Sequence, residues 1–176
     1  EWHGMDRAIE GLANYYQNGG KRNIVLTLAG AGASLPSLQR LAQKHHLEDH
    51  VIFPGILTGN GLDALYDNSD FAVSSLGMHR YDDIVAASIK TREYLAKGIP
   101  FIYAGEVDVF QNEKLDYCFQ APKDDSPIDF RQFVEFYDAM LEANAMSSIT
   151  KDIRAYAERH VSMHKAMENV AEYLKP

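Results

Sequence analysis

The clearest chemistry in this sequence lies between Ser88 and Gly98, where a run of helix-forming residues follows a long loop. Ser88 is a typical helix N-cap, and the amides of Ile89 and Lys90 would then be free to meet an anion in the first turn. The helix dipole favours negative charge at that end, and the Lys90 ammonium adds a full positive charge. Phosphate groups are therefore the ligands that suit this stretch best.

Glu93 lies three residues beyond Lys90, on a neighbouring position of the predicted helix surface. Its carboxylate can accept two hydroxyl hydrogen bonds, which is the arrangement that a ribose diol offers. The alternative is an ordinary Lys90–Glu93 pair on a solvated helix surface, worth about 0.2–0.5 kcal/mol. The residue types and their spacing leave both interpretations open.

A second group of polar residues lies in the long segment 74–88. His79 and Arg80 suit an anion, whereas Asp82 and Asp83 suit a cation or a catalytic base. Long loops in compact domains often carry function. For each of these residues taken singly, a solvated polar loop is the interpretation that we favour.

Glycines mark two weaker candidates. Gly30 and Gly32 follow a predicted strand and would let the backbone approach a phosphate, but no third glycine completes a dinucleotide fingerprint, so we favour a tight turn. His3 precedes Gly4 and a predicted helix, where it suits a phosphate contact, and a disordered terminus is the alternative. With Cys118 as the single cysteine and no paired-histidine zinc motif, we expect no metal and no cofactor.

Segments that alternate between strand and helix would hold these candidates. Short apolar, β-branched runs predict strands at 24–29, 51–53, 71–74, 99–103 and 117–119. Apolar residues at one-face spacing predict helices at 35–46, 62–66, 88–97, 130–141, 149–159 and 163–174. Such alternation indicates parallel strands joined by right-handed crossovers. We therefore expect an α/β fold with an open, doubly wound, mostly parallel Rossmann-like sheet, helices on both faces and extra C-terminal helices.

The loops to examine follow from this architecture, because ligands of such sheets bind beyond the carboxyl ends of the strands. These loops come after Ala29, Phe53, Ser74 and Tyr103. Ser88 and the helix that it begins stand directly after the third of them, so the anion site inferred above lies at the expected edge of the sheet.

Composition narrows the class of protein. The 176 residues fit one domain, and with 46% apolar and 24% charged residues they can bury a core. No apolar run approaches the roughly 20 residues of a membrane helix. A net charge of −8 disfavours binding to nucleic acid. The sequence shows no secretory leader, so we expect a cytoplasmic location, and it lacks an initiator Met, so we expect a piece of a longer polypeptide.

The order of the segments resembles the C-terminal, donor-nucleotide-binding domain of GT-B type glycosyltransferases of the group 1 family, which use nucleotide sugars. The likeness covers nearly the whole chain. It is carried by Trp2–Ile9, Leu28–Gly32, Val51–Gly55, Asp70–Ser75, Arg92–Pro100 and Tyr156–Ser162. Each motif is short, but six in the same order form a specific pattern.

The resemblance implies a role for several positions. Glu93 stands where the family binds the ribose hydroxyls. Ile89 and Lys90, after the cap residue Ser88, stand where backbone amides hold the diphosphate. Leu57, two residues past Gly55, stands where the family grips the base.

Two positions depart from the family pattern. The family's earlier glutamate, near the transferred sugar, is replaced by Val85, and Asp82 or Asp83 would have to substitute for it. The family's phosphate-binding lysine is replaced by His3. Histidine is a weaker cation at neutral pH, so either Lys90 or Arg92 would compensate, or phosphate binding would be poor.

The resemblance also implies a function and a domain plan. The reaction would move a sugar from a nucleoside diphosphate to an acceptor hydroxyl, in surface polysaccharide or glycoconjugate synthesis, with electrostatic stabilisation of the leaving diphosphate. Residues 1–176 would form the donor domain, and 148–176 its C-terminal helices. An N-terminal acceptor domain and the first strand of this domain would precede Glu1, and residues 1–176 alone would be inactive. Peripheral contact of that missing domain with a membrane stays open.

Two other functions fit the same architecture. A nucleotide-sugar epimerase would need acid–base carboxylates or histidines in the cleft. A non-catalytic nucleotide-binding module would have lost part of the cleft, and Val85 and His3 are the residues that favour it.

Overall fold

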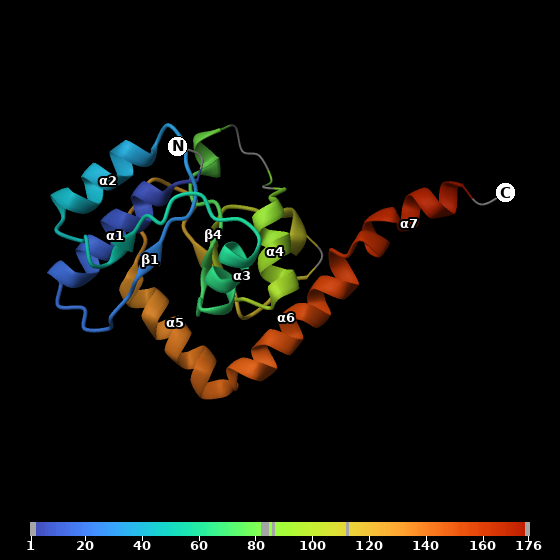
Figure 1. Ribbon diagram of the computed structural model, residues 1–176. Coiled ribbons are helices and arrows are strands. Elements are labelled where there is room, and N and C mark those ends of the chain that lie inside the picture. The colour runs from blue at the N-terminus through green and yellow to red at the C-terminus, as the bar shows by residue number, and fades with distance from the viewer. Residues whose placement is uncertain (1–2, 82–84, 86, 112, 175–176) are drawn as a thin grey trace.

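The computed structural model describes residues 3–81, 85, 87–111 and 113–174, in which helices and strands alternate as the sequence predicts (Figure 1). The helices are α1 (Met5–Gln17), α2 (Leu35–Lys44), α3 (Asn60–Asp67), α4 (Ile89–Lys97), α5 (Phe130–Ala143), α6 (Met146–His160) and α7 (Met163–Tyr173). The strands are β1 (Leu26–Thr27), β2 (Val51–Ile52), β3 (Ala72–Val73), β4 (Phe101–Ala104) and β5 (Phe119–Ala121). Two 3-10 helices, η1 (Met78–Arg80) and η2 (Asp108–Phe110), follow β3 and β4.

All strand pairs in the described residues are parallel, which confirms the predicted fold class. In one sheet β1 pairs with β2, with Leu26 opposite Val51. In the other, β4 lies between β3 and β5, with Ala72 opposite Phe101. The expected single sheet is thus present as two parts, because among the described residues no ladder joins β1 to β3.

One hydrophobic core spans both sheets on the face covered by α1, α2 and α5. Ile9 and Leu12 of α1 are fully buried and belong to the same cluster as Leu26 of β1 and Ile102 of β4. Burial of such side chains contributes roughly 1.5–3 kcal/mol each. Helix α1 therefore fastens the two-stranded sheet to the three-stranded one.

The opposite face of the three-stranded sheet is covered by α4 and α6. Leu95 of α4 packs in one cluster with Phe101 of β4 and with Ile153 and Tyr156 of α6. The two helices come very close where α4 ends at Gly98, whose φ of 75° is left-handed. A Cβ added there would lie 2.7 Å from the Thr150 carbonyl oxygen, so both the backbone angle and the approach of α6 require glycine.

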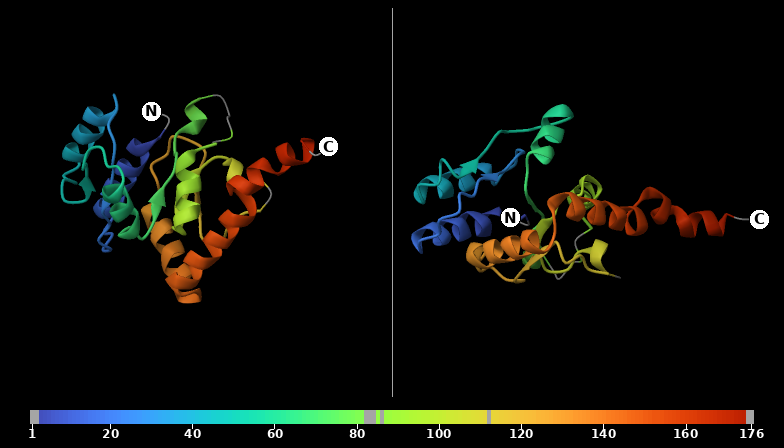
Figure 2. Two further views of the ribbon diagram at one scale, coloured as in Figure 1. Left: turned by 45° about the vertical axis from the view of Figure 1, so that its right-hand side comes forward. Right: turned by 90° about the horizontal axis from the view of Figure 1, so that it is seen from below.

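The last helix, α7, leaves the body of the molecule. Helix α6 runs along α4, and α7 continues outward beyond the sheets (Figure 2). Within the described part of the chain, no helix combines the length and the apolar character that crossing a membrane requires.

Candidate nucleotide-binding site

Helix α4 begins at the carboxyl end of β3 with the predicted cap. Ser88 has an extended backbone, and its hydroxyl accepts a hydrogen bond from the Lys90 amide at 3.2 Å. Of the two amides expected to be free, that of Lys90 therefore already has a partner, and the amide of Ile89 is the better candidate for an anion. The Ile89 side chain is 75% exposed and does not cover this end of the helix, so a ligand can approach the Ile89 amide.

Lys90 and His3 form the cationic part of the site. The Lys90 ammonium lies 3.1 Å from His3 Nδ1, although the residues are 87 positions apart. Burial lowers the pKa of Lys90 to about 8. Burial, and then the neighbouring Lys90 charge, lower the pKa of His3 to about 4. At neutral pH the ammonium thus donates to an uncharged imidazole, and Lys90 carries the positive charge of the pair.

The backbone around Gly4 holds His3 against Leu76 and Gly77, in the segment that follows β3. The Leu76 amide donates to the His3 carbonyl at 2.9 Å. Gly4 has a φ of 63°, and a Cβ there would lie 2.6 Å from backbone atoms of Leu76 and Gly77. Glycine is therefore required for the start of α1 to reach the end of β3, where Lys90 meets it.

Glu93 lies on the exposed surface of α4, beyond Lys90. Its Oε2 accepts a hydrogen bond from the Tyr66 hydroxyl of α3 at 2.9 Å. Because Lys90 contacts His3 and Glu93 contacts Tyr66, the ordinary Lys90–Glu93 surface pair is not the arrangement that the structure adopts. The carboxylate is accessible to a ligand, as a ribose contact requires.

Arg92 forms an ion pair with Asp108 of η2. Its two terminal nitrogens lie 2.5 Å and 3.3 Å from the carboxylate oxygens of Asp108, and one also donates to the Ser88 carbonyl at 3.3 Å. A guanidinium already paired with a carboxylate has less charge to offer a phosphate. A contact of Arg92 with a diphosphate stays a prediction, and the geometry favours Lys90.

The loops after β1 and β2 lie side by side at the same edge. The Gly30 amide donates to the Gly55 carbonyl at 2.7 Å. No atom lies within 4 Å of the position that a Cβ would take at Gly30, Gly32 or Gly55, so this backbone faces open space. Leu57 follows in the same loop and is half-buried. Its contact with a base, like a phosphate contact at Gly30, stays a prediction.

The polar residues of the segment 74–88 are used mainly within the fold. Arg80 donates to both carboxylate oxygens of Asp6, at 3.0 and 2.7 Å, and to Asp125 at 2.7 Å. His79 Nε2 lies 3.0 Å from the same Asp125. These pairs tie η1 to α1 and to the segment before α5, so the anion-binding alternative for His79 and Arg80 is disfavoured. Asp82 and Asp83 lie outside the described residues.

Sequence reasoning missed Arg7, which is fully buried in α1. Its guanidinium donates to the carbonyls of Ser126 at 2.7 Å, of Pro122 at 3.0 Å and of Leu76. It thereby fixes Leu76, whose amide donates to the His3 carbonyl. No local signal predicts this burial, because arginine is normally exposed and only partners distant in the chain make it tolerable.

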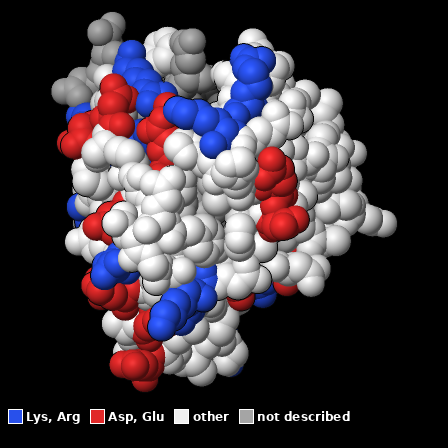
Figure 3. All heavy atoms as spheres, turned by 90° about the vertical axis from the view of Figure 1, so that its left-hand side faces the viewer, with Lys and Arg blue, Asp and Glu red and all other residues white. Residues whose placement is uncertain are grey.

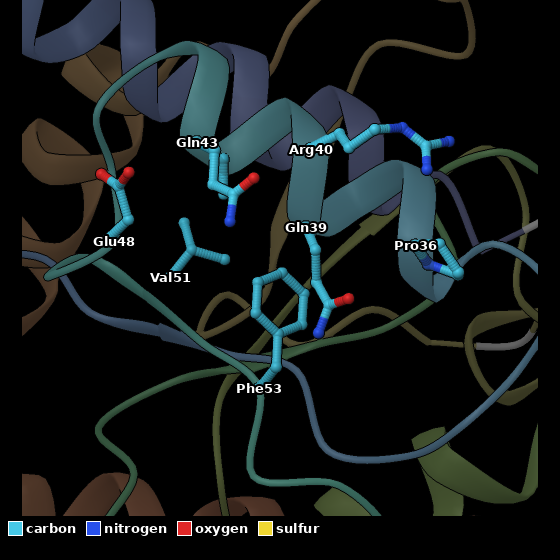
Figure 4. A pocket seen from close by; sticks show the side chains of 8 residues that line it. Pro36, Gln39, Arg40, Gln43, Glu48, Val51 and Phe53 are labelled. Atoms are coloured by element: carbon cyan, nitrogen blue, oxygen red, sulfur yellow. The ribbon is translucent and has the colours of Figure 1, made fainter.

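Two hollows on the surface of the described part of the chain lie away from these residues. One, of about 470 Å³, lies between α2 and the β2 segment, where Gln39 and Gln43 face Val51 and Phe53 (Figure 4). The other, of about 260 Å³, is lined mainly by residues 113–117 and by Asp152 and Arg159. Neither hollow is lined by a predicted site residue. Among the described residues, no group of three His, Cys, Asp or Glu is placed to hold a metal.

The charge on the face beside α1 and α2 is mixed. Figure 3 shows basic and acidic side chains interspersed around an uncharged central area. Among the described residues of this face, acidic side chains stand between the basic ones, which does not suit a polyanion.

Comparison with known proteins assigns the family. The family described as glycosyl transferases group 1 matches residues 1–125. The chain belongs to the group 1 glycosyltransferases. No sequence among the curated proteins is significantly similar to it. The Rossmann-like fold and the GT-B resemblance are confirmed together by this match and by solved structures of glycosyltransferases.

Solved structures share the fold of this group 1 glycosyltransferase chain. Anabaena Alr3699/HepE in complex with UDP-glucose superposes with a TM-score of 0.71 at 15% identity, and a glycosyltransferase from Rickettsia africae ESF-5 with 0.72 at 16%. WaaG, a glycosyltransferase involved in lipopolysaccharide biosynthesis, gives 0.65 at 20%. The matches cover 98–99% of this chain but only 44–45% of those proteins, so the chain spans less than half of their length.

Proposed function

We propose that this chain is the donor-binding part of a glycosyltransferase that moves a sugar from a nucleoside diphosphate to an acceptor hydroxyl. The observation that carries the proposal is the position of Lys90 against His3 at the start of α4, with Glu93 exposed one turn farther along. A cation and a helix N-terminus suit the diphosphate, and a carboxylate suits the ribose. The UDP-glucose bound by Anabaena HepE makes a uridine nucleotide the first ligand to test.

The chemistry that these residues supply is electrostatic. As the bond between sugar and diphosphate breaks, negative charge grows on the diphosphate, and the Lys90 ammonium with the Ile89 amide would stabilise it. Glu93 would fix the ribose, and Leu57 would contact the base. None of these roles needs a metal or cofactor.

The acceptor side would come from a preceding domain. The chain spans less than half of the solved glycosyltransferases that it resembles, which supports this plan. The break between β1 and β3 in the described residues supports a further strand of the same domain, placed between them by the segment before Glu1. We expect residues 1–176 alone to bind nucleotide weakly and to show no turnover. The description of WaaG as an enzyme of lipopolysaccharide biosynthesis supports surface polysaccharide or glycoconjugate synthesis as the pathway.

Calorimetry on the full-length protein tests this function. UDP, GDP, ADP and CDP are titrated into the wild type, into Glu93→Ala and into Glu135→Ala, whose glutamate is exposed on α5. We expect one nucleotide to bind, Glu93→Ala to weaken it about 10- to 100-fold, as for a lost charged hydrogen bond, and Glu135→Ala to leave it unchanged. Absence of binding to every nucleotide, or equal binding by Glu93→Ala, would contradict the proposal.

A non-catalytic nucleotide-binding module is the second candidate, and Val85 favours it. This half-buried residue stands where the family's glutamate near the transferred sugar is expected. A product assay with UDP-glucose and the full-length protein separates the two functions. Nucleotide binding with neither sugar transfer nor hydrolysis would favour the module.

A further inference from the structure

Helix α3 is held against α4 by side chains that converge on Tyr66. Lys97 of α4 makes ion pairs with Asp63 at 2.8 Å and with Asp67 at 3.3 Å, and its ammonium lies 5.9 Å from the centre of the Tyr66 ring. The Tyr66 ring also meets Tyr94 edge to face at 5.9 Å. Because α3 has no buried side chain, these contacts are the main link that aligns it with α4.

The Tyr66 hydroxyl is aimed by this packing at Glu93. It donates to Oε2 at 2.9 Å, and among the described residues no hydrogen bond to Oε1 is found. Burial, and then the hydrogen bond to Glu93, raise the pKa of Tyr66 to about 12, so the phenol keeps its proton and remains a donor at neutral pH. A neutral donor leaves the negative charge on Glu93, whereas a cationic partner would compensate it.

An exposed glutamate otherwise samples several rotamers, and a ligand that needs one of them must overcome the entropy of the rest. A hydrogen bond to one oxygen removes most of that freedom. It presents the second oxygen in a constant direction, which is how a supporting residue pre-organises a binding group.

We propose that Tyr66 is a positioning residue whose hydroxyl holds Oε2 of Glu93 so that Oε1 receives the ribose hydroxyls of a nucleoside diphosphate. The inference rests on the proposed function and extends it. Tyr66 then sets the preference of the site for ribonucleotides over 2′-deoxyribonucleotides, without touching the nucleotide itself.

The test measures this preference by calorimetry on the full-length protein with UDP and 2′-deoxy-UDP, or with the same pair of whichever nucleotide binds tightest. The variants are Tyr66→Phe, Glu93→Gln and, as matched control, Tyr117→Phe, whose hydroxyl donates to the exposed Asp152 carboxylate at the same 2.9 Å. We expect the wild type to prefer UDP roughly 10-fold. Tyr66→Phe should reduce the preference to about 3-fold or less, because it weakens UDP more than 2′-deoxy-UDP, which keeps only one of the two hydroxyls. Tyr117→Phe should retain it.

The outcomes distinguish a failure of the positioning role of Tyr66 from a failure of the proposed donor site. If Glu93→Gln loses the preference and Tyr66→Phe keeps it, the positioning role is wrong and the donor site stands. If Tyr66→Phe weakens both nucleotides equally, Tyr66 supports the fold and not the orientation of Glu93, which also overturns the inference. If Glu93→Gln keeps the full preference, the proposed donor site itself fails.

Discussion

The ammonium nitrogen of Lys90 lies 3.1 Å from Nδ1 of His3, an imidazole that is uncharged at neutral pH. Burial alone accounts for the lowered Lys90 pKa of about 8. The Lys90 ammonium is therefore poorly solvated. Because electrostatic attraction is stronger where water is partly excluded, an incoming anion is attracted more strongly by such a charge.

The affinity for UDP should fall as pH rises through 8. The protonated Lys90 attracts the diphosphate, and the unliganded protein loses that proton near pH 8. We expect calorimetry to show that the dissociation constant of the wild type rises several-fold between pH 7 and pH 9. The dissociation constant of Lys90→Met should be higher than that of the wild type and should change little with pH. An equally steep pH profile in Lys90→Met would show that another group titrates.

Arg92→Met should leave nucleotide affinity within about twofold of wild type, since its guanidinium is engaged by Asp108. Such a partly exposed ion pair contributes about 0–1 kcal/mol to folding, so a small loss of stability is expected. The same calorimetric titrations measure the nucleotide affinity of this variant. A loss of affinity as large as that of Lys90→Met would instead assign the diphosphate contact to Arg92.

Lys90 also predicts how stability depends on pH. Its pKa is lowered in the folded protein from 10.5 to about 8, so between these values the unfolded chain binds more protons and folding is favoured as pH rises. Over the whole window the gain is at most about 3 kcal/mol. Urea unfolding at pH 7.5 and 9.5 should show a larger gain for wild type than for Lys90→Met. Parallel changes in the two proteins would refute the prediction.

Gly98→Ala should destabilise the protein by about 2–4 kcal/mol, since the new methyl group meets the Thr150 carbonyl and the backbone has a positive φ. Gly19→Ala is the matched control, because Gly19 has a φ of 79° and no atom near its Cβ position. It isolates the cost of the backbone angle, about 1 kcal/mol. Equal losses in thermal unfolding would mean that α4 and α6 are not packed as closely as described.

Arg7→Met should cost about 3 kcal/mol or more, because it leaves the carbonyls of Leu76, Pro122 and Ser126 without their donor. Arg22→Met removes an arginine whose pair with Asp138 is exposed, and should cost less than about 1 kcal/mol. Chemical denaturation measures both. A loss for Arg7→Met as small as that for Arg22→Met would show that water replaces the guanidinium.

Cys118 should resist thiol reagents in the folded state. The residue is buried, and burial raises the pKa of its thiol to about 12, so almost no thiolate is present at neutral pH. As the single cysteine of the sequence, it reports on unfolding of the segment that leads into β5. We expect labelling to follow the unfolding transition in urea. Fast labelling without denaturant would contradict the burial.

Several elements of the site were predictable because their causes are local. The cap at Ser88 and the stop at Gly98 follow from the backbone chemistry of those residues, and both are confirmed. The parallel orientation of the strands follows from the alternation of short apolar runs with helices. The last strand was placed less well: β5 begins at Phe119 and not at Tyr117, since edge residues without strong periodicity depend on their partner strand.

The sequence by itself determined the fold class, the family resemblance and the position of Glu93 on an accessible helix. Only the tertiary structure decided which charges are paired: Lys90 with His3, Arg80 with Asp6, and Arg92 with Asp108. The physical reason is that periodicity and capping act over a few neighbouring residues, whereas the solvation and partners of a side chain depend on contacts across the fold. That packing alone decides whether Lys90 lies on the surface or is partly desolvated against His3, a residue from the start of the chain.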